Sequence, residues 1–276
     1  TAVGSESEKA DDPVVFVACD LAAVLGELLR EVRDGLSDRL PAISPHSVIL
    51  NATHTHTSMV IGNGYYDHPG GDVLTPDECR AVVVEGVLES IEEAWKRRRP
   101  RTLGRAFGHA VVGHNRYAAY ADGHAEMYGD TNRPDFFGFG GYQDHSLDML
   151  FTWNPDGRLA GVALAIPCPS QVVEHLEKWS ADYWHEVRGE LRRRLGEDLQ
   201  VLPLCSAAGD QSPHFLLYAE QEAEMRSRRG LNERQEIARR VADAVEGALA
   251  CTAPVVDHEP VLAHRSRTLE LSPLRI

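Results

Sequence analysis

The sequence predicts an α/β fold in which mixed β-sheets are flanked by helices. Short apolar runs typical of buried strands alternate with longer segments whose apolar residues recur at helical spacing. Asn154-Pro155-Asp156-Gly157 is a hairpin turn between two such runs, so part of the sheet should be antiparallel. With 276 residues, of which 43% are hydrophobic, the chain can bury a sizeable core. We expect a flexible end over 1–12 and one α/β domain over 13–276.

In the first half of the chain, apolar runs and helix start signals predict strands and helices in alternation. Asp20 can cap a helix after the first strand, and Thr75-Pro76-Asp77-Glu78 is a strong start for another. The expected elements are a strand at 14–19, a helix at 21–32, a strand at 47–50, a loop at 61–74 and a helix at 75–95.

The second half follows the same alternation around one long irregular stretch. Residues 113–142 are rich in Gly, Tyr, Asp and Asn, and a loop of that length inside a domain is more often functional than idle. The expected elements are strands at 102–112, 147–153 and 159–166, a helix at 180–195, a short apolar run at 201–205, a long helix at 219–249 and a final strand at 261–271.

Two histidines follow the strand at 47–50. Because side chains alternate between the faces of a strand, His54 and His56 share one face, and the threonines at 53, 55 and 57 take the other. Two imidazoles about 7 Å apart can ligate one metal ion, or divide the work of ligand and proton carrier. The simpler alternative is a strand end with two half-exposed histidines.

Three further segments at predicted strand ends carry unusual residues, and catalytic groups gather at such ends in α/β proteins. Arg116 could bind a carboxylate through two of its nitrogens, polarise a carbonyl, or only stabilise its own loop. Cys168 lies between two prolines. As a thiolate it would be a good zinc ligand, and as a thiol it would be a small buried residue.

The third segment is Gly209-Asp210-Gln211-Ser212-Pro213-His214. Ser212 suits the N-cap of a helix that begins at Pro213, yet a serine there also lies in a field that favours developing negative charge. Asp210 could stabilise the turn or orient a neighbouring catalytic group.

The bulk composition excludes several classes of function. A net charge of -14 argues against nucleic acid as a partner. Five scattered cysteines argue against a disulfide framework. No stretch is apolar enough to span a membrane. The oligomeric state and the compartment are left open, with the cytoplasm slightly favoured over secretion.

The histidine motif and the serine motif resemble a known family. Asn51-Ala52-Thr53-His54-Thr55-His56-Thr57 and Gly209-Asp210-Gln211-Ser212-Pro213 are similar to two hallmark motifs of the neutral/alkaline (non-lysosomal) ceramidases, roughly Ala-Thr-His-Thr-His-Ser and Gly-Asp-Val-Ser-Pro. Val17–Leu21 and Asn115-Arg116 resemble two further segments. The order and spacing agree over most of 14–271, which corresponds to the amino-terminal half of the family's catalytic domain.

The resemblance implies a zinc-dependent amide hydrolase, whose catalytic domain over 13–276 would be incomplete at both ends. His54 would ligate zinc, His56 would contact the substrate or the attacking group, Arg116 would lie beside the scissile amide, and Ser212 would be the catalytic serine. Cys168 stands where the family has a second zinc-binding histidine. Either its thiolate binds the metal, or a neighbour supplies the nitrogen: His145, His175 or His185. The family's glutamate and tyrosine ligands come from a part of the domain that this sequence does not include.

We therefore predict a Zn²⁺-dependent hydrolase of an amide bond, with a small-molecule amide or lipid-like substrate that need not be ceramide. Zinc would polarise the carbonyl or activate water, and Ser212, Arg116 and Asp210 would assist the reaction while His56 carries a proton. Two alternatives stay open. One is a metal-independent serine hydrolase with Ser212 as nucleophile and His214 or His56 as base. The other is an inactive ceramidase-like binding module in which Cys168 marks a lost site.

Overall fold

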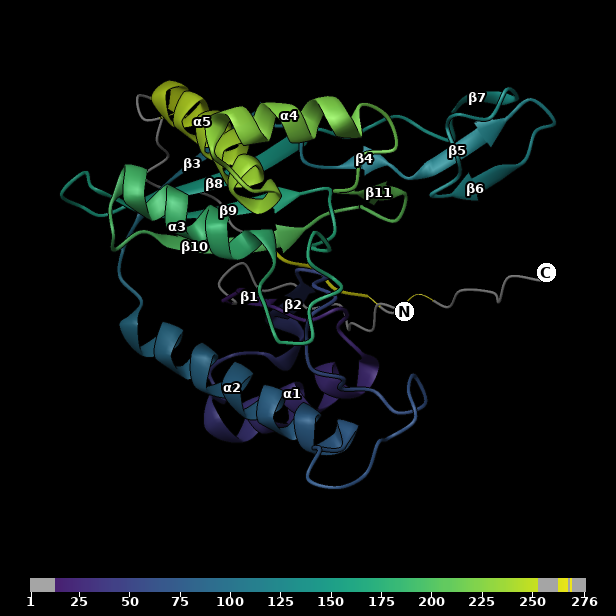
Figure 1. Cartoon of the computed structure of the whole chain (residues 1–276). Helices are drawn as coiled ribbons and strands as arrows, with labels where there is room; N and C mark the ends of the chain where they lie inside the picture. The colour runs from purple at the N-terminus through teal and green to yellow at the C-terminus, as the bar shows by residue number, and fades with distance from the viewer. Residues whose placement is uncertain (1–12, 253–262, 268, 270–276) are drawn as a thin grey trace.

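The computed structural model describes residues 13–252, 263–267 and 269, and arranges them in layers (Figure 1). Helices α3 (Tyr183–Leu195) and α5 (Glu233–Thr252) cover one face of a four-stranded sheet. Strands β1 (Val15–Cys19) and β2 (Val48–Ala52) lie on the other side. Helices α1 (Gly26–Arg39) and α2 (Pro76–Arg97) form the outermost layer beyond them.

The four-stranded sheet is mixed, as the sequence predicts. Its strands are β3 (Thr102–His109), β8 (Ser146–Trp153), β9 (Leu159–Ile166) and β10 (Gln200–Cys205), in the order β10-β9-β8-β3. The β8–β9 hairpin is antiparallel and turns at Gly157, whose φ of +82° suits glycine. Strand β10 is parallel to β9, because α3 provides the crossover between them.

Alternation along β8 builds the larger of two cores. Leu147, Met149, Phe151 and Trp153 are buried on the face that α3 and α5 cover, while Asp148 on the opposite face is exposed. Each such buried side chain contributes about 1.5–3 kcal/mol. Through this core, the two helices pack as one layer against the sheet.

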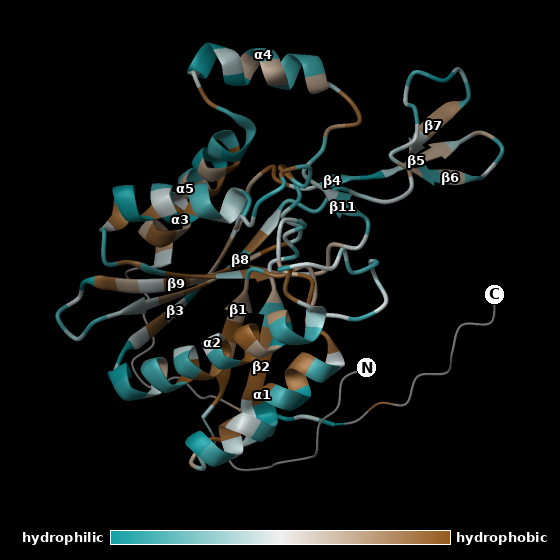
Figure 2. Cartoon of the chain, turned by 60° about the horizontal axis from the view of Figure 1, so that its bottom comes forward, coloured by the Kyte–Doolittle hydropathy of each residue, from teal (hydrophilic) through white to brown (hydrophobic). Residues whose placement is uncertain are grey.

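The second core lies between β1, β2 and the helices α1 and α2. Strands β1 and β2 are parallel, and Figure 2 shows both as strongly hydrophobic while α1 and α2 carry hydrophilic outer faces. Helix α2 begins as expected, because Thr75 and Glu78 form a complete capping box. Asn51 joins the two halves: its side-chain amide donates to Cys205 O (3.0 Å) and accepts from Cys205 N (2.9 Å).

The predicted irregular stretch at 113–142 contains strands instead. Three of them form a small antiparallel sheet: β5 (Tyr117–Tyr120), β6 (Ala125–Met127) and β7 (Phe136–Phe139). Directly before this sheet in the chain, β4 (His114–Asn115) pairs with β11 (Gln211–Ser212), so the two predicted site segments lie side by side.

Three predicted helices differ in the structure. Asp20 caps none, because its carboxylate binds Arg188 (3.0 Å) and Thr53 (3.1 Å), and α1 begins only at Gly26. No helix begins at Pro213. The long helix at 219–249 is two helices, α4 (Ala219–Arg229) and α5, because Gly230 adopts φ +66° and ends the first.

Some expectations concern residues that are not described, namely the flexible end at 1–12 and part of the final strand at 261–271; residues 263–267 of that segment are described and form no strand. Among the described helices, none is both long and apolar enough to cross a bilayer.

Candidate active site

The two predicted histidines project from a loop that begins where β2 ends. His54 and His56 are exposed, while Thr53, Thr55 and Thr57 are buried, as the alternation predicts. The segment is nevertheless no strand, since His54 has a left-handed backbone (φ +59°). The two imidazole rings meet edge-on with centroids 5.0 Å apart.

The buried threonines hold this loop against the segment that follows β9. Thr55 and Thr57 both donate to Ser180 O, at 2.9 and 3.1 Å. Ser170 Oγ donates to Thr53 O (2.8 Å), and the His56 amide donates to Ser170 O (3.3 Å). The buried threonines therefore fix the backbone of this loop, and the two histidines project from its opposite face.

Arg116 lies between the histidine loop and the serine loop. Its Nη2 donates to Gly209 O (2.7 Å), its amide donates to Asp210 O (2.9 Å), and its guanidinium lies 5.9 Å from the Tyr128 ring. Desolvation, with the charges of His56 and Arg116, lowers the pKa of His54, so this imidazole is neutral near pH 7. Arg116 is thus a permanent cation close to the histidines.

Ser212 is fully buried on β11, opposite His114 on β4. Its Oγ accepts from the Tyr128 hydroxyl (3.2 Å) and from the His214 amide (3.2 Å), which leaves its own proton free to be donated. The ring of His214 turns instead to Glu174. The serine therefore has two hydrogen-bond donors but, among the described residues, no imidazole base in contact.

Asp210 braces the loop and does not touch the histidines or Ser212 in the described contacts. It accepts from Asn115 Nδ2 (2.9 Å) and from Gln211 Nε2 (3.0 Å). This matches the turn-stabilising role that the sequence left open for it.

Glu174 lies at the centre of the site and is missed by the sequence argument. Its Oε2 lies 3.1 Å from His56 Nδ1, and its Oε1 lies 3.3 Å from His214 Nε2. Gln171 Nε2 donates to Oε2 (3.0 Å). Glu174 and Tyr128 lie in segments without a recognisable motif; only the length of the 113–142 stretch indicates that Tyr128 has a role.

The second predicted zinc ligand, Cys168, is closed off from solvent. Its side chain is completely buried in the larger core, and its thiol donates to Pro169 O (3.4 Å). In the chain without a metal ion, burial raises the pKa of this thiol well above its usual value.

The neighbours that could replace Cys168 lie elsewhere. His145 packs near His114, with ring centroids 6.1 Å apart, and His175 and His185 are exposed. Within the described part of the chain, no three His, Cys, Asp or Glu side chains are grouped so that they could hold one metal ion. Zinc binding thus stays a prediction that rests on the exposed, neutral His54 and its neighbour His56.

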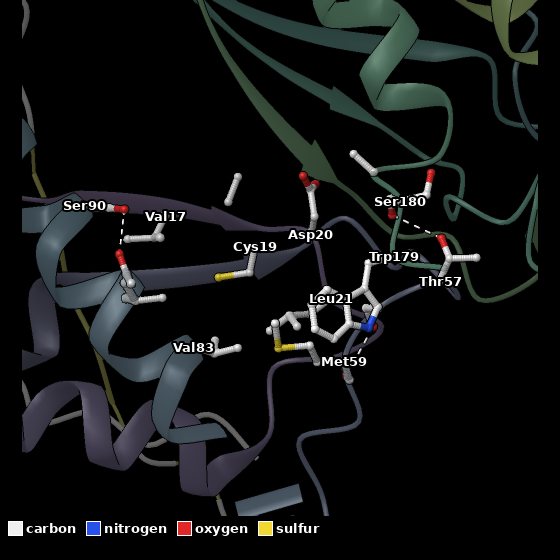
Figure 3. Close-up of a pocket in the computed structure, with 15 residues that line it drawn as sticks. Val17, Cys19, Asp20, Leu21, Thr57, Met59, Val83, Ser90, Trp179 and Ser180 are labelled. Carbon is white, nitrogen blue, oxygen red and sulfur yellow. Dashed lines mark hydrogen bonds between the residues drawn. The ribbon is translucent and has the colours of Figure 1, made fainter. Parts of the chain in front are cut away.

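A cavity of about 460 Å³ adjoins the histidine loop, between β1 and α2 (Figure 3). Thr57, Ser58 and Met59, which follow His56 directly, form one wall. Most of the remaining lining is apolar: Val17, Cys19, Leu21, Val83, Val87 and Trp179. Trp179 is 66% exposed, so this aromatic side chain lies at the solvent side of the cavity.

Comparison with solved structures identifies the architecture. A structure described as "Ceramidase complexed with C2" superposes with a TM-score of 0.63 at 20% identity, over 88% of this chain and 36% of its own length. The fold is that of neutral ceramidase. The neutral ceramidase from Pseudomonas aeruginosa gives a TM-score of 0.60 at 19% identity, over 88% of this chain and 37% of its own.

The predicted resemblance to the neutral ceramidases is thereby confirmed for the fold. The chain spans little more than a third of the length of either ceramidase. No protein-family model and no curated protein sequence matches it. The roles of the site residues consequently depend on the geometry given above.

Proposed function

We propose that this chain is a hydrolase of the ceramidase kind that cleaves an amide bond. One observation carries the proposal: two loops far apart in the sequence, at 53–57 and 209–214, meet at one surface through Glu174. Their meeting brings imidazoles, a guanidinium and hydroxyl donors to the same place, which is the set of groups that acyl transfer needs. Two of the left-handed non-glycine residues, His54 and Tyr128, belong to this site, and such strain gathers at functional sites.

The described side chains can divide the hydrolysis of an amide among them. His56 accepts a proton from a water molecule, whose oxygen attacks the carbonyl carbon. Arg116 and the hydroxyl of Ser212, itself held by Tyr128, stabilise the oxyanion that forms. As the carbon–nitrogen bond breaks, protonated His56 returns the proton to the leaving amine. Asp210 keeps the loop of Ser212 in place.

We propose further that the cavity beside the histidine loop receives an apolar part of the substrate. Its walls are largely hydrocarbon, and its Thr57–Met59 wall continues directly from His56. A lipid-like amide would place its polar group at the imidazoles and its apolar group against Val83 and Val87. A small polar amide has no apolar group that would fill this cavity.

Hydrolysis is tested with a series of N-acyl amides of increasing acyl length. The wild-type chain should release amine, and Ser212→Ala and His56→Gln should each lower kcat by roughly 100-fold. His175→Gln is the matched control, since His175 is exposed in the Glu174 segment. Failure to cleave any member of the series would contradict the proposal and favour a binding module.

Zinc dependence is tested separately by metal analysis of protein purified with zinc. About one zinc per chain, lost in His54→Ala and retained in Cys168→Ala, would support a metal at His54. His56, Arg116 and Ser212 act in the hydrolysis through their own side chains. Activity that survives a chelator would show that the hydrolysis does not need zinc, and the roles of His56, Arg116 and Ser212 would be unchanged.

A further inference from the structure

Glu174 connects the two motif loops through three contacts. His56 Nδ1 lies 3.1 Å from Oε2, and His214 Nε2 lies 3.3 Å from Oε1, so each imidazole approaches a different oxygen. Gln171, itself 2% exposed, donates to Oε2 at 3.0 Å and holds the carboxylate in this orientation. The carboxylate is thus placed between two histidines that belong to different loops.

A carboxylate in this position determines where the imidazole protons lie. Burial raises the pKa of Glu174, but Gln171, His214 and His56 together lower it below its usual value, so the group is ionised near pH 7. An ionised carboxylate only accepts hydrogen bonds. An imidazole nitrogen that approaches this carboxylate to about 3 Å is favoured as N–H, since its lone pair would otherwise face the negative charge.

We infer that Glu174 is a positioning residue that fixes His56 as the Nδ1–H tautomer and His214 as the Nε2–H tautomer. The lone pair of His56 then lies on Nε2, and that of His214 on Nδ1. This arrangement leaves His56 Nε2 as the atom that accepts the proton of the attacking water. Only this catalytic role of His56 rests on the proposed function. The tautomers themselves follow from these two contacts and from the negative charge of Glu174.

The two rings turn different nitrogens to the carboxylate, Nδ1 in His56 and Nε2 in His214. His56 and His214 approach the carboxylate from separate loops, and Glu174 offers one oxygen to each. Glutamine at this position would have one acceptor oxygen and one donor nitrogen. Glu174→Gln can therefore support only one of the two tautomers at a time.

Long-range proton–nitrogen NMR of the full chain reads these tautomers directly, at a pH well above the ordinary histidine pKa of about 6.5. His56→Gln and His214→Gln assign the signals. His68 is an internal standard, because Gly70 N donates to its Nδ1 (3.0 Å) and its Nε2 faces Val73 O (3.0 Å). We expect Nδ1–H for His56 and Nε2–H for His214 and His68.

In Glu174→Gln, His56 or His214 should lose its tautomer preference while His68 keeps its own. Glu177→Gln is the matched control: Glu177 is exposed in the same segment and forms none of the ion pairs found among the described residues. On a hydrolysed amide, Glu174→Gln should lower kcat about 10-fold to 100-fold with little change in KM, and Glu177→Gln should not.

Opposite tautomers in the wild-type chain would overturn the inference, and this result does not require Glu174→Gln to fold. Unchanged tautomers in a folded Glu174→Gln would overturn it as well, as would a metal ion bound at His56 Nδ1. Absence of hydrolysis with the expected tautomers would count against the proposed function alone, because the NMR measurement does not depend on turnover.

Discussion

At the residue scale, the site is a set of side chains whose neighbours decide their chemistry. Cys168 and His54 both occupy positions with metal-ligand chemistry, yet one is fully buried and the other projects from a loop. Burial makes a thiol hard to ionise, while desolvation keeps an imidazole neutral and able to donate its lone pair. Residue type alone could not separate these two outcomes.

Tyr128 gives a first prediction at this scale. Its hydroxyl donates to Ser212 Oγ, and its side chain is partly exposed, so Tyr128→Phe should fold normally. Loss of the hydroxyl that holds Ser212 Oγ beside the oxyanion should lower kcat about 10-fold to 100-fold with little effect on KM. Steady-state kinetics check this, with the exposed Tyr66→Phe as control. Equal rates for the two variants would exclude Tyr128 from the reaction.

Glu236 gives a prediction about pH. This residue is 2% exposed; burial raises its pKa, but Arg239 and Arg240 outweigh burial and lower it to about 2, against a usual value of 4.5. A lowered pKa stabilises the fold above pH 4.5, and that contribution is lost as pH falls from 4.5 towards 2.

Glu236→Gln should therefore reduce the free energy of unfolding at pH 7 by up to about 3 kcal/mol. Denaturant titrations at several pH values measure the difference from wild type. That difference should shrink between pH 4.5 and 2. Glu89→Gln, on the exposed face of α2, should show no such change. A difference that is constant with pH would contradict the assignment.

At the element scale, backbone conformation decides where helices end. The segment at 219–249 has helical periodicity throughout, but Gly230 adopts φ +66° and its amide donates to Ser227 O (3.0 Å). The second helix then begins at Glu233. Glycine pays no steric penalty in this conformation, so it can divide a continuous helical pattern.

Gly230→Ala should consequently destabilise the fold by about 1 kcal/mol, since alanine is strained at positive φ. Gly189→Ala, inside α3, should stabilise it by about 0.5–1 kcal/mol, because a Cβ there meets open space. Thermal unfolding of the two variants provides the comparison. Stabilisation by both substitutions would show that Gly230 does not need its left-handed backbone.

Helix α2 also provides a test of the cavity. A Cβ at Gly86 meets no atom within 4 Å, and Gly86 lines the cavity. Gly86→Leu should fill it without backbone strain and raise KM for long-chain amides at least 10-fold, with a smaller effect on short ones. Gly189→Leu, on α3, is the matched control. Equal effects on long and short substrates would place the apolar group elsewhere.

At the scale of the whole molecule, polar contacts join the two cores. Asn51 makes a paired hydrogen bond with the backbone of Cys205, and Arg188 binds Asp20 across the same boundary. Asn51→Ala should cost about 1–3 kcal/mol, because the partly buried amide and carbonyl of Cys205 lose their partner. Denaturant unfolding measures this cost, and Asn63→Ala, which removes only an exposed contact to Asp77, is the control.

Much of the fold could be predicted from the sequence, because its signals are local. The capping box at Thr75, the hairpin turn at Asn154–Gly157 and the alternation of β8 act over a few residues. The errors arise where distant residues compete. Asp20 would have been a good N-cap, but Arg188 and Thr53 bind its carboxylate instead. Ser212 would have been another, but pairing of β11 with β4 places it in a strand.

The sequence by itself determined which residues could perform chemistry: the histidine pair, Arg116 and Ser212, each in a short motif at a strand end. Only the tertiary structure decided how they are connected. Glu174 has no motif of its own, and it matters because the chain folds its carboxylate between His56 and His214. Motifs record local geometry, whereas the proton positions in this site depend on contacts between loops that are distant in the chain.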